Sequence, residues 1–220
     1  MIYIVGLGAG DVNQIPYGVV TYLKQAQHLF LRTDHHPMVE FLKNNQISYT
    51  SFDNIYEKYD TFEEVYAQII KSLLAKEKEF TDIVYAVPGH PCVAEYVVKV
   101  LLQQTNCQII GGQSFLDSMF AALKIDPIEG LQIMDALNFD AKKINQDSHL
   151  FIPQVFDQLV ASNLKLDLME IYPDEQPICL VSQAGSSQQT LNYCQLYELD
   201  YNFKIDNLLT VYIPPIVKYA

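Results

Sequence analysis

The chain has 220 residues, long enough for one large or two small domains, and half of them are apolar, so a sizeable core can form. Its formal net charge of −12 argues against nucleic acids and anionic membrane surfaces as partners. We expect no membrane-spanning helix and no signal peptide, because the chain has no apolar run of about 18 residues and its N-terminus lacks a basic region.

The cysteines and the basic residues narrow the class of protein further. None of the four cysteines forms a CxxC pair, so we expect a reduced, cytoplasmic setting and no structural metal. Of the 14 basic residues all but one are lysines, and Arg32 is the single arginine. Because arginine is the usual bidentate clamp for carboxylate and phosphate groups, a substrate with many carboxylates would find few such clamps here.

The first predicted strand, residues 2–5, ends in the glycine-rich segment Gly6-Leu7-Gly8-Ala9-Gly10-Asp11. The G-x-G-x-x-G fingerprint of dinucleotide-binding loops requires glycine where Asp11 stands, which disfavours a nicotinamide cofactor. The segment is therefore either a flexible turn or a loop pressed against another ligand. Pro16 is well placed in the first turn of a helix that runs through residue 27.

The second predicted strand is residues 28–31, and a polar loop follows it. Asp34, His35 and His36 in this loop suit a metal ion or a proton shuttle. Adjacent side chains on an extended chain point in opposite directions, so one metal would rarely take both histidines, and a solvated loop is the better interpretation. The next predicted elements are a helix at 38–44, a strand at 47–52, an acidic and aromatic loop at 53–59, and a helix at 61–78 with a capping box formed by Thr61 and Glu64.

The central stretch is a buried strand at 82–87, the turn Pro88-Gly89-His90-Pro91, and a helix at 93–103. Ligands of open α/β sheets bind at the carboxyl ends of strands, where this turn lies. Gly89 lets a ligand approach the backbone closely, and the two prolines stiffen the loop. On local pattern alone, an ordinary strand-to-helix turn is an equally good interpretation.

A further strand at 107–110 leads into Gly111-Gly112, which marks a hinge or a close approach of ligand, and Ser114 is placed to cap a helix through residue 122. Up to this point strand and helix alternate, which predicts a parallel sheet with helices on both faces. Beyond it helices become rarer, which predicts a second, α+β domain with a mixed sheet. Its predicted strands are residues 131–135, 148–152, 164–171, 178–183, 194–199 and 208–213.

Several of these segments resemble one known family. Gly6 to Asp11 after an N-terminal strand resembles the opening motif of the tetrapyrrole methylases, the class III S-adenosylmethionine-dependent methyltransferases, which include diphthine synthase. Pro88 to Pro91 resembles the second motif and residues 110–123 the third. The resemblance runs along the whole chain and is closest to the methylase-like domain that precedes a MazG-type nucleotide pyrophosphohydrolase. That branch is matched by Gly89-His90-Pro91, Ile125-Asp126-Pro127, Glu129-Gly130-Leu131-Gln132, Phe151-Ile152-Pro153-Gln154-Val155 and Tyr212-Ile213-Pro214-Pro215.

The resemblance implies an α/β protein with the two-domain tetrapyrrole methylase-like fold. Residues 1–112 would form the parallel-sheet N-terminal domain and residues 113–220 the α+β mixed-sheet C-terminal domain, with S-adenosylmethionine in the cleft between them. Ala9 and His90 stand where the family usually has a proline and an acidic residue. The residues implied in donor binding are Ala9, Gly89, His90, Val93, Ser114, Phe115, Gln154, Ser182 and Leu209.

The resemblance also implies an activity, methyl transfer to a small acceptor with S-adenosylhomocysteine as product. A tetrapyrrole is one candidate acceptor, although tetrapyrrole precursors carry many carboxylates. If the acceptor must lose a proton, our hypothesis is that His36 or Asp34 takes it. The alternative is a non-catalytic donor-binding or dimerisation module that serves a MazG-type hydrolase domain, which would begin just after Pro215. The family commonly forms homodimers.

Overall fold

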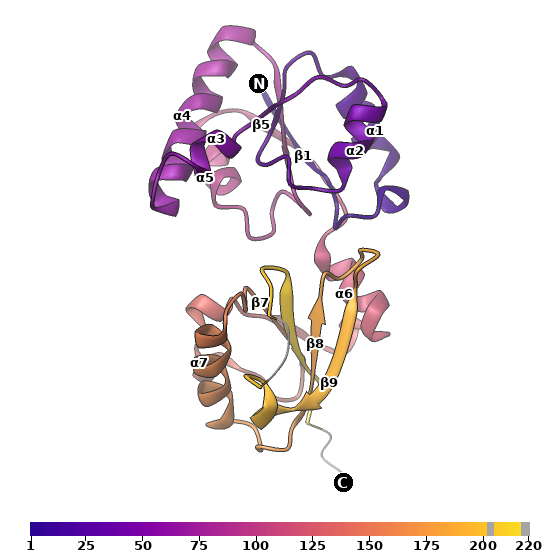
Figure 1. The fold of residues 1–220 in the computed structure, drawn as a ribbon, viewed down its shortest axis with the longest axis vertical. Helices are drawn as coiled ribbons and strands as arrows, with labels where there is room; N and C mark the ends of the chain where they lie inside the picture. Colours follow the sequence, from indigo (N-terminus) through magenta and orange to yellow (C-terminus); the bar gives the residue numbers. More distant parts are fainter. Residues whose placement is uncertain (202–204, 217–220) are drawn as a thin grey trace. The chain divides into compact units, whose positions relative to one another are not determined.

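The computed structural model describes residues 1–201 and 205–216, and it divides into two compact units, Met1–Ser118 and Met119–Ala220 (Figure 1). The predicted boundary between residues 112 and 113 lies just before α6 (Phe115–Leu123), a helix that begins in the first unit and ends in the second. We describe each unit by itself.

A five-stranded parallel sheet forms the centre of the first unit, with the strand order β3-β2-β4-β1-β5. Its strands are β1 (Ile2–Gly6), β2 (Leu29–Leu31), β3 (Thr50–Ser51), β4 (Ile83–Val87) and β5 (Cys107–Ile110). The segments between the strands contain the 3-10 helix η1 (Val12–Gln14) and the helices α1 (Tyr17–Gln25), α2 (Met38–Asn44), α3 (Asp53–Tyr56), α4 (Phe62–Phe80) and α5 (Tyr96–Gln104).

Helices pack on both faces of this sheet, as the alternation of strand and helix predicts; Figure 1 shows α4 and α5 on one side and α1 and α2 on the other. In β1, Ile2 and Ile4 join the core beneath α4 and α5, whereas Tyr3 and Val5 join the core beneath α1 and α2. Successive strand side chains point to opposite faces, so a strand covered on both sides needs an unbroken apolar run. All five residues of β4 are accordingly buried.

The second unit contains a mixed sheet with the strand order β6-β7-β10-β8-β9. Only β6 and β7 run parallel; the other pairs are antiparallel. The strands are β6 (Leu131–Ile133), β7 (His149–Pro153), β8 (Pro177–Ser182), β9 (Thr190–Gln195) and β10 (Leu209–Ile213). Outside the sheet lie α7 (Gln158–Met169) and the 3-10 helices η2 (Pro127–Glu129), η3 (Ala136–Asn138), η4 (Ala141–Lys143) and η5 (Leu196–Glu198).

One predicted strand of the second unit is wrong. Residues 164–171 form the end of α7 and the turn after it, rather than a strand. Leu164 and Leu168 are buried, whereas Leu166 is 62% exposed. A strand would place all three on one face, but a helix places only the residues four positions apart together. Asp157 caps the helix by accepting a hydrogen bond from the Val160 amide, and this start signal lies upstream of the predicted strand.

Three further segments differ from the predicted elements. The loop predicted at 53–59 begins with the short helix α3. The strand predicted at 47–52 is reduced to the two residues of β3, and the strand predicted at 194–199 ends at Gln195, where η5 begins. Each segment lies at the margin of its sheet or beyond, where local hydrogen bonds compete with strand pairing.

The long helix α4 starts where the sequence predicts. The Thr61 hydroxyl accepts a hydrogen bond from the Glu64 amide at 3.3 Å and donates one to the Glu64 carboxylate at 2.9 Å. No helix among the described residues is both long enough and apolar enough to cross a membrane.

We predict that Leu168→Ala lowers the free energy of unfolding by about 2–5 kcal/mol, because the substitution leaves a cavity in the core under α7. The matched variant Leu166→Ala removes the same atoms from an exposed position and changes stability by at most about 0.5 kcal/mol. Chemical denaturation followed by circular dichroism measures both. Equal losses would mean that the two leucines share one face, as in a strand.

Candidate functional site

Four loops of the first unit lie along one edge of its sheet. Parallel strands end at the same edge, so the segments after β2, β4, β1 and β5 are neighbours in the order of their strands. These segments are residues 32–37, 88–95, 7–11 and 111–114. They contain all three glycine-bearing segments and the polar loop that the sequence singles out.

The loops after β1 and β4 are joined through their backbones. The Gly8 amide donates to the Gly89 carbonyl at 3.2 Å, and the Gly89 amide donates to the Gly8 carbonyl at 2.9 Å. Just before them, the Leu7 amide donates to the Val87 carbonyl at 2.8 Å. Gly8 and Gly89 have φ angles of +78° and +65°, which side-chain-bearing residues rarely adopt. Two segments far apart in the sequence thus form one paired structure that needs glycine.

The loop after β5 packs against the loops after β1 and β4 with main chain directly against main chain. A Cβ placed on Gly6 would lie 2.5 Å from the Gly89 carbonyl oxygen and 2.7 Å from the Gly112 amide nitrogen. A Cβ placed on Gly112 would lie 2.5 Å from the Gly6 oxygen and 2.7 Å from the Gly89 oxygen. We call Gly6, Gly89 and Gly112 the glycine contact. Its neighbours are main-chain atoms, which cannot swing away as a side chain can.

His90 occupies the turn next to the glycine contact. Its Nδ1 accepts a hydrogen bond from the Cys92 amide at 3.1 Å, so Nδ1 carries no proton and the neutral ring carries its proton on Nε2. The Nε2 atom lies 3.4 Å from the position of a Cβ at Gly111. The His90 carbonyl accepts from the Val93 amide at 3.0 Å. His90 therefore stiffens the turn with Nδ1 and presents a hydrogen-bond donor toward the loop after β5.

His36 ties the loop after β2 to the same site. Its Nδ1 accepts from the Met38 amide at 3.2 Å, which leaves the proton on Nε2, and Nε2 donates to the Gly8 carbonyl at 3.1 Å. Burial lowers the pKa of His36, and the hydrogen bond to Gly8 opposes that effect. Both ring nitrogens are thus engaged, and the geometry favours a role for His36 in holding Gly8.

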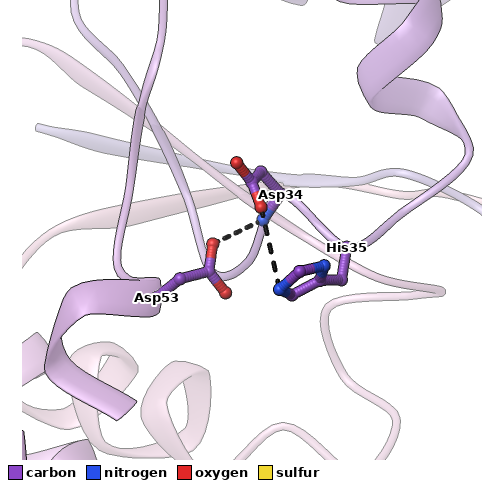
Figure 2. A group of neighbouring side chains, drawn as sticks. All are labelled: Asp34, His35 and Asp53. Carbon is purple, nitrogen blue, oxygen red and sulfur yellow. Dashed lines mark hydrogen bonds and ion pairs between the residues drawn. The ribbon is translucent and has the colours of Figure 1, made fainter. Parts of the chain in front are cut away.

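Asp34 and His35 lie beside Asp53 (Figure 2). One ligand atom from each of the three lies within 4.8 Å of the others. The Asp53 carboxylate accepts from the Thr33 hydroxyl at 2.6 Å and from the Asp34 amide at 2.8 Å. Burial tends to raise the pKa of Asp53, but these hydrogen bonds outweigh it and lower the pKa. Asp53 therefore fixes the loop after β2, and the Asp34 and His35 side chains are 41% and 86% exposed.

Ser114 is buried at the start of α6. Its hydroxyl oxygen accepts from the Leu116 amide at 3.0 Å, so it caps the helix, and its own amide donates to the Asp117 carboxylate at 2.9 Å. Phe115 follows as the first helical residue. Ala9 lies in the β1 loop beyond the paired Gly8, with its side chain partly exposed. These positions bring the first-unit candidates Ala9, Gly89, His90, Val93, Ser114 and Phe115 onto consecutive loops of one sheet edge.

The second-unit candidates also share one edge of their sheet. β10 is antiparallel to both β7 and β8, so its start lies beside their ends. Leu209 is paired with Ser182, and Thr210 with Pro153, the residue before Gln154. Gln154 has a φ angle of +72°, which marks a sharp turn of the backbone there. Three candidates from different parts of the sequence are therefore neighbours across three strands.

One polar pair that sequence reasoning missed lies in the first unit. Arg32 forms an ion pair with Glu95, whose side chain is only 4% exposed, and its Nε donates to the Tyr56 hydroxyl at 3.1 Å. The contact joins the loop after β2 to Glu95, the residue directly before α5. Glu95 ends the loop after β4, and because it lies 63 positions from Arg32, no local sequence signal marks the pair. The single arginine of the chain is therefore already neutralised.

Comparison with known proteins places this fold in a family. The structure defines the class of protein: a two-sheet α/β protein with glycine-bearing loops at the carboxyl edge of a parallel sheet. The family model described as Tetrapyrrole (Corrin/Porphyrin) Methylases matches residues 1–200. The chain belongs to the tetrapyrrole methylase family.

Several solved structures have the same fold. Cobalt precorrin-4 methyltransferase has a TM-score of 0.73 at 14% identity, covering 97% of this chain and 94% of that one. Diphthine synthase has a TM-score of 0.71 at 16% identity, covering 99% and 91%. Uroporphyrin-III C-methyltransferase from Thermus thermophilus, solved with S-adenosylhomocysteine, has a TM-score of 0.70 at 15% identity, covering 97% and 91%. These likenesses show the shared fold.

A sequence relative extends beyond the region compared. The Bacillus subtilis (strain 168) protein described as uncharacterized protein YabN is 44% identical over 98% of this chain and 45% of its own length. The chain thus spans less than half the length of that relative.

We predict that Gly112→Ala destabilises the first unit by about 1–3 kcal/mol, because its Cβ would overlap the main-chain oxygens of Gly6 and Gly89. Gly18→Ala is the matched control. Gly18 lies in α1 with nothing within 4 Å of its Cβ position, so alanine there stabilises the helix by up to about 1 kcal/mol. Thermal and chemical denaturation compare the two variants. A Gly112→Ala variant as stable as the parent would refute the tight packing of the glycine contact.

Proposed function

We propose that this chain is an S-adenosylmethionine-dependent methyltransferase acting on a small acceptor. Membership of the tetrapyrrole methylase family supports the activity, and a solved relative with S-adenosylhomocysteine supports the cofactor. The observation that carries the proposal is the glycine contact, which lets three loops at the carboxyl edge of the first sheet pack backbone against backbone. Bare backbone at that edge fits a ligand that is held by amides and carbonyls.

We assign the donor site to the loop positions described above. In the first unit these are Ala9, Gly89, His90, Val93, Ser114 and Phe115, and in the second unit Gln154, Ser182 and Leu209. The structural support is that each set occupies one edge of its own sheet. His90 offers its Nε2–H as a donor where an acidic residue would offer an acceptor, so it suits a carbonyl or carboxylate oxygen of the ligand.

The chemistry asks little of the protein beyond placement. The sulfonium of S-adenosylmethionine supplies an activated methyl group, so the chain has to orient donor and acceptor in line and exclude water. His36 contributes by fixing Gly8, since both of its ring nitrogens are engaged. Of His36 and Asp34, Asp34 is the better placed to take a proton from the methyl acceptor, because its side chain is 41% exposed.

A second candidate function is a non-catalytic donor-binding or dimerisation module. The observation that favours it is the paired state of Arg32, which leaves no free guanidinium in the chain to clamp a polycarboxylate tetrapyrrole. YabN is more than twice as long as the part that matches this chain, which leaves room for another domain there. We propose that the module serves such a domain, of the MazG type. A homodimer in the cytoplasm is the setting we propose for either function.

We predict that calorimetric titration of the purified chain gives micromolar binding of S-adenosylmethionine and S-adenosylhomocysteine, about −8 kcal/mol, and none of NAD. Binding of the two sulfur ligands would establish the donor site. NAD is the negative control, because the glycine-bearing loops lack the dinucleotide fingerprint. Formation of S-adenosylhomocysteine with a panel of small acceptors then separates the enzyme from the binding module. Absence of binding by both sulfur ligands would contradict the proposal.

A further inference from the structure

The loop after β4 is fixed at both of its ends. Near its start, Gly89 pairs with Gly8 through two backbone hydrogen bonds. At its end, directly before α5, the Glu95 carboxylate forms an ion pair with Arg32 of the loop after β2. The turn that contains His90 lies between these two attachments, so its shape depends on both of them.

Arg32 is a rigid anchor for this loop. Its amide donates to the Ala86 carbonyl at 2.9 Å, which fixes its backbone to β4. Its Nε donates to the Tyr56 hydroxyl at 3.1 Å, which orients the guanidinium. A guanidinium serves two partners in a fixed geometry, whereas the ammonium of lysine is a point charge on a flexible stem. The position therefore suits the one arginine of a chain whose other basic residues are all lysines.

Ala94 holds backbone strain beside the ion pair. Its φ angle of +54° lies in the left-handed region, which a residue with a side chain adopts only at a cost in free energy. On one side of it, the Val93 amide donates to the His90 carbonyl at 3.0 Å, and on the other side Glu95 is held by its ion pair. If Glu95 were released, Ala94 would relax to a more favourable φ angle and the turn would move.

The ion pair contributes more to geometry than to stability. The Glu95 side chain is 4% exposed and the Arg32 side chain 25%. Burial raises the pKa of Glu95, and the Arg32 charge opposes that effect. Removing two charges from water offsets much of their mutual attraction, and apolar side chains of similar size often replace a buried ion pair without loss of stability. What the pair supplies is therefore a fixed position for Glu95.

We propose that Arg32 and Glu95 are positioning residues for the methyl donor, because their ion pair keeps Ala94 left-handed and so keeps the His90 turn in the shape that binds the donor. Neither side chain has to touch the donor itself. This inference rests on the proposed function, since it requires that the turn contacts S-adenosylmethionine. It goes beyond that function by assigning control of donor affinity to two residues outside the donor site.

The first test compares donor affinity with stability. Glu95→Gln leaves Arg32 without its partner, so we expect a lower thermal midpoint and S-adenosylhomocysteine binding weakened roughly ten- to a hundredfold. The double variant Arg32→Met/Glu95→Met replaces both charges by apolar side chains. We expect its thermal midpoint to return close to that of the parent while its affinity stays low. Calorimetric titration and thermal denaturation measure both quantities. Recovery of both in the double variant would overturn the proposal.

A rescue variant tests the role of Ala94. Glycine adopts a φ angle of +54° without strain, so Ala94→Gly favours the parent turn without restoring any charge. Added to the double variant, it should recover at least about threefold of the lost S-adenosylhomocysteine affinity. A merely structural ion pair gives no such recovery. Its absence would overturn the proposal, because the ion pair would then not act through Ala94.

A second ion pair supplies the matched control. Lys165 pairs with Asp200 in the second unit, and their side chains are 17% and 16% exposed. Asp200→Asn breaks this pair, so we expect a lower thermal midpoint with unchanged S-adenosylhomocysteine affinity. Equal losses of affinity in Asp200→Asn and Glu95→Gln would mean that affinity simply follows stability, which would overturn the proposal.

Amide hydrogen exchange without ligand separates this inference from the proposed function. The Cys92 amide donates to His90 Nδ1 at 3.1 Å and the Val93 amide to the His90 carbonyl at 3.0 Å. In Glu95→Gln we expect both amides to exchange at least roughly threefold faster, and in Asp200→Asn at the parent rate. Unchanged exchange in Glu95→Gln would overturn the inference whatever the donor does. If instead the parent binds neither sulfur ligand, the proposed function fails, and the positioning of a donor fails with it.

Discussion

The candidate site depends on one steric constraint, the backbone packing of Gly6, Gly89 and Gly112. Three loops that are separated by up to a hundred residues approach one another so closely that a single methyl group would lie about 2.5 Å from main-chain oxygens. A side chain at Gly6 or Gly112 would separate the loops, whereas Gly89 is needed for its φ angle of +65°. The paired amides and carbonyls of Gly8 and Gly89 then fix the register of the first two loops. The candidate donor site consists of the loops that this packing holds together.

The polar groups around the glycine contact act mainly as positioning residues. His36 donates to the Gly8 carbonyl, His90 holds its own turn, and Arg32 with Glu95 ties the loop after β2 to α5. The His36 and Arg32 contacts each join two loops and the His90 contact braces one, so together they hold the edge of the sheet as one unit. Such a unit suits a reaction in which the cofactor is already activated and the protein contributes orientation.

The sequence predicted the first unit well because its elements carry local signals. Apolar runs such as residues 82–87 need no partner to be recognised as buried strands, and Thr61 and Ser114 mark helix starts directly. The strand predicted at 164–171 failed because Leu164, Leu166 and Leu168 alternate with polar residues, as in a strand, in a segment that the Asp157 cap makes helical. The ion pair of Arg32 with Glu95 was out of reach, because it spans 63 positions and depends on how the loops fold back.

The candidate site shows the same division between local and long-range information. Gly89 and His90 are recognisable in a turn at the end of a strand. That Gly6 meets Gly112, and that Leu209 lies beside Ser182, follows from strand order and register, which single-sequence patterns do not specify.

The most direct measurement is a crystal structure of the chain with S-adenosylhomocysteine bound. The account predicts that the ligand contacts the backbone of Gly8 to Gly10, the Gly89-His90 turn and the loop after β5, with His90 Nε2 donating to one of its oxygens. A ligand bound away from these loops would contradict the central claim that the glycine contact exists to hold the methyl donor.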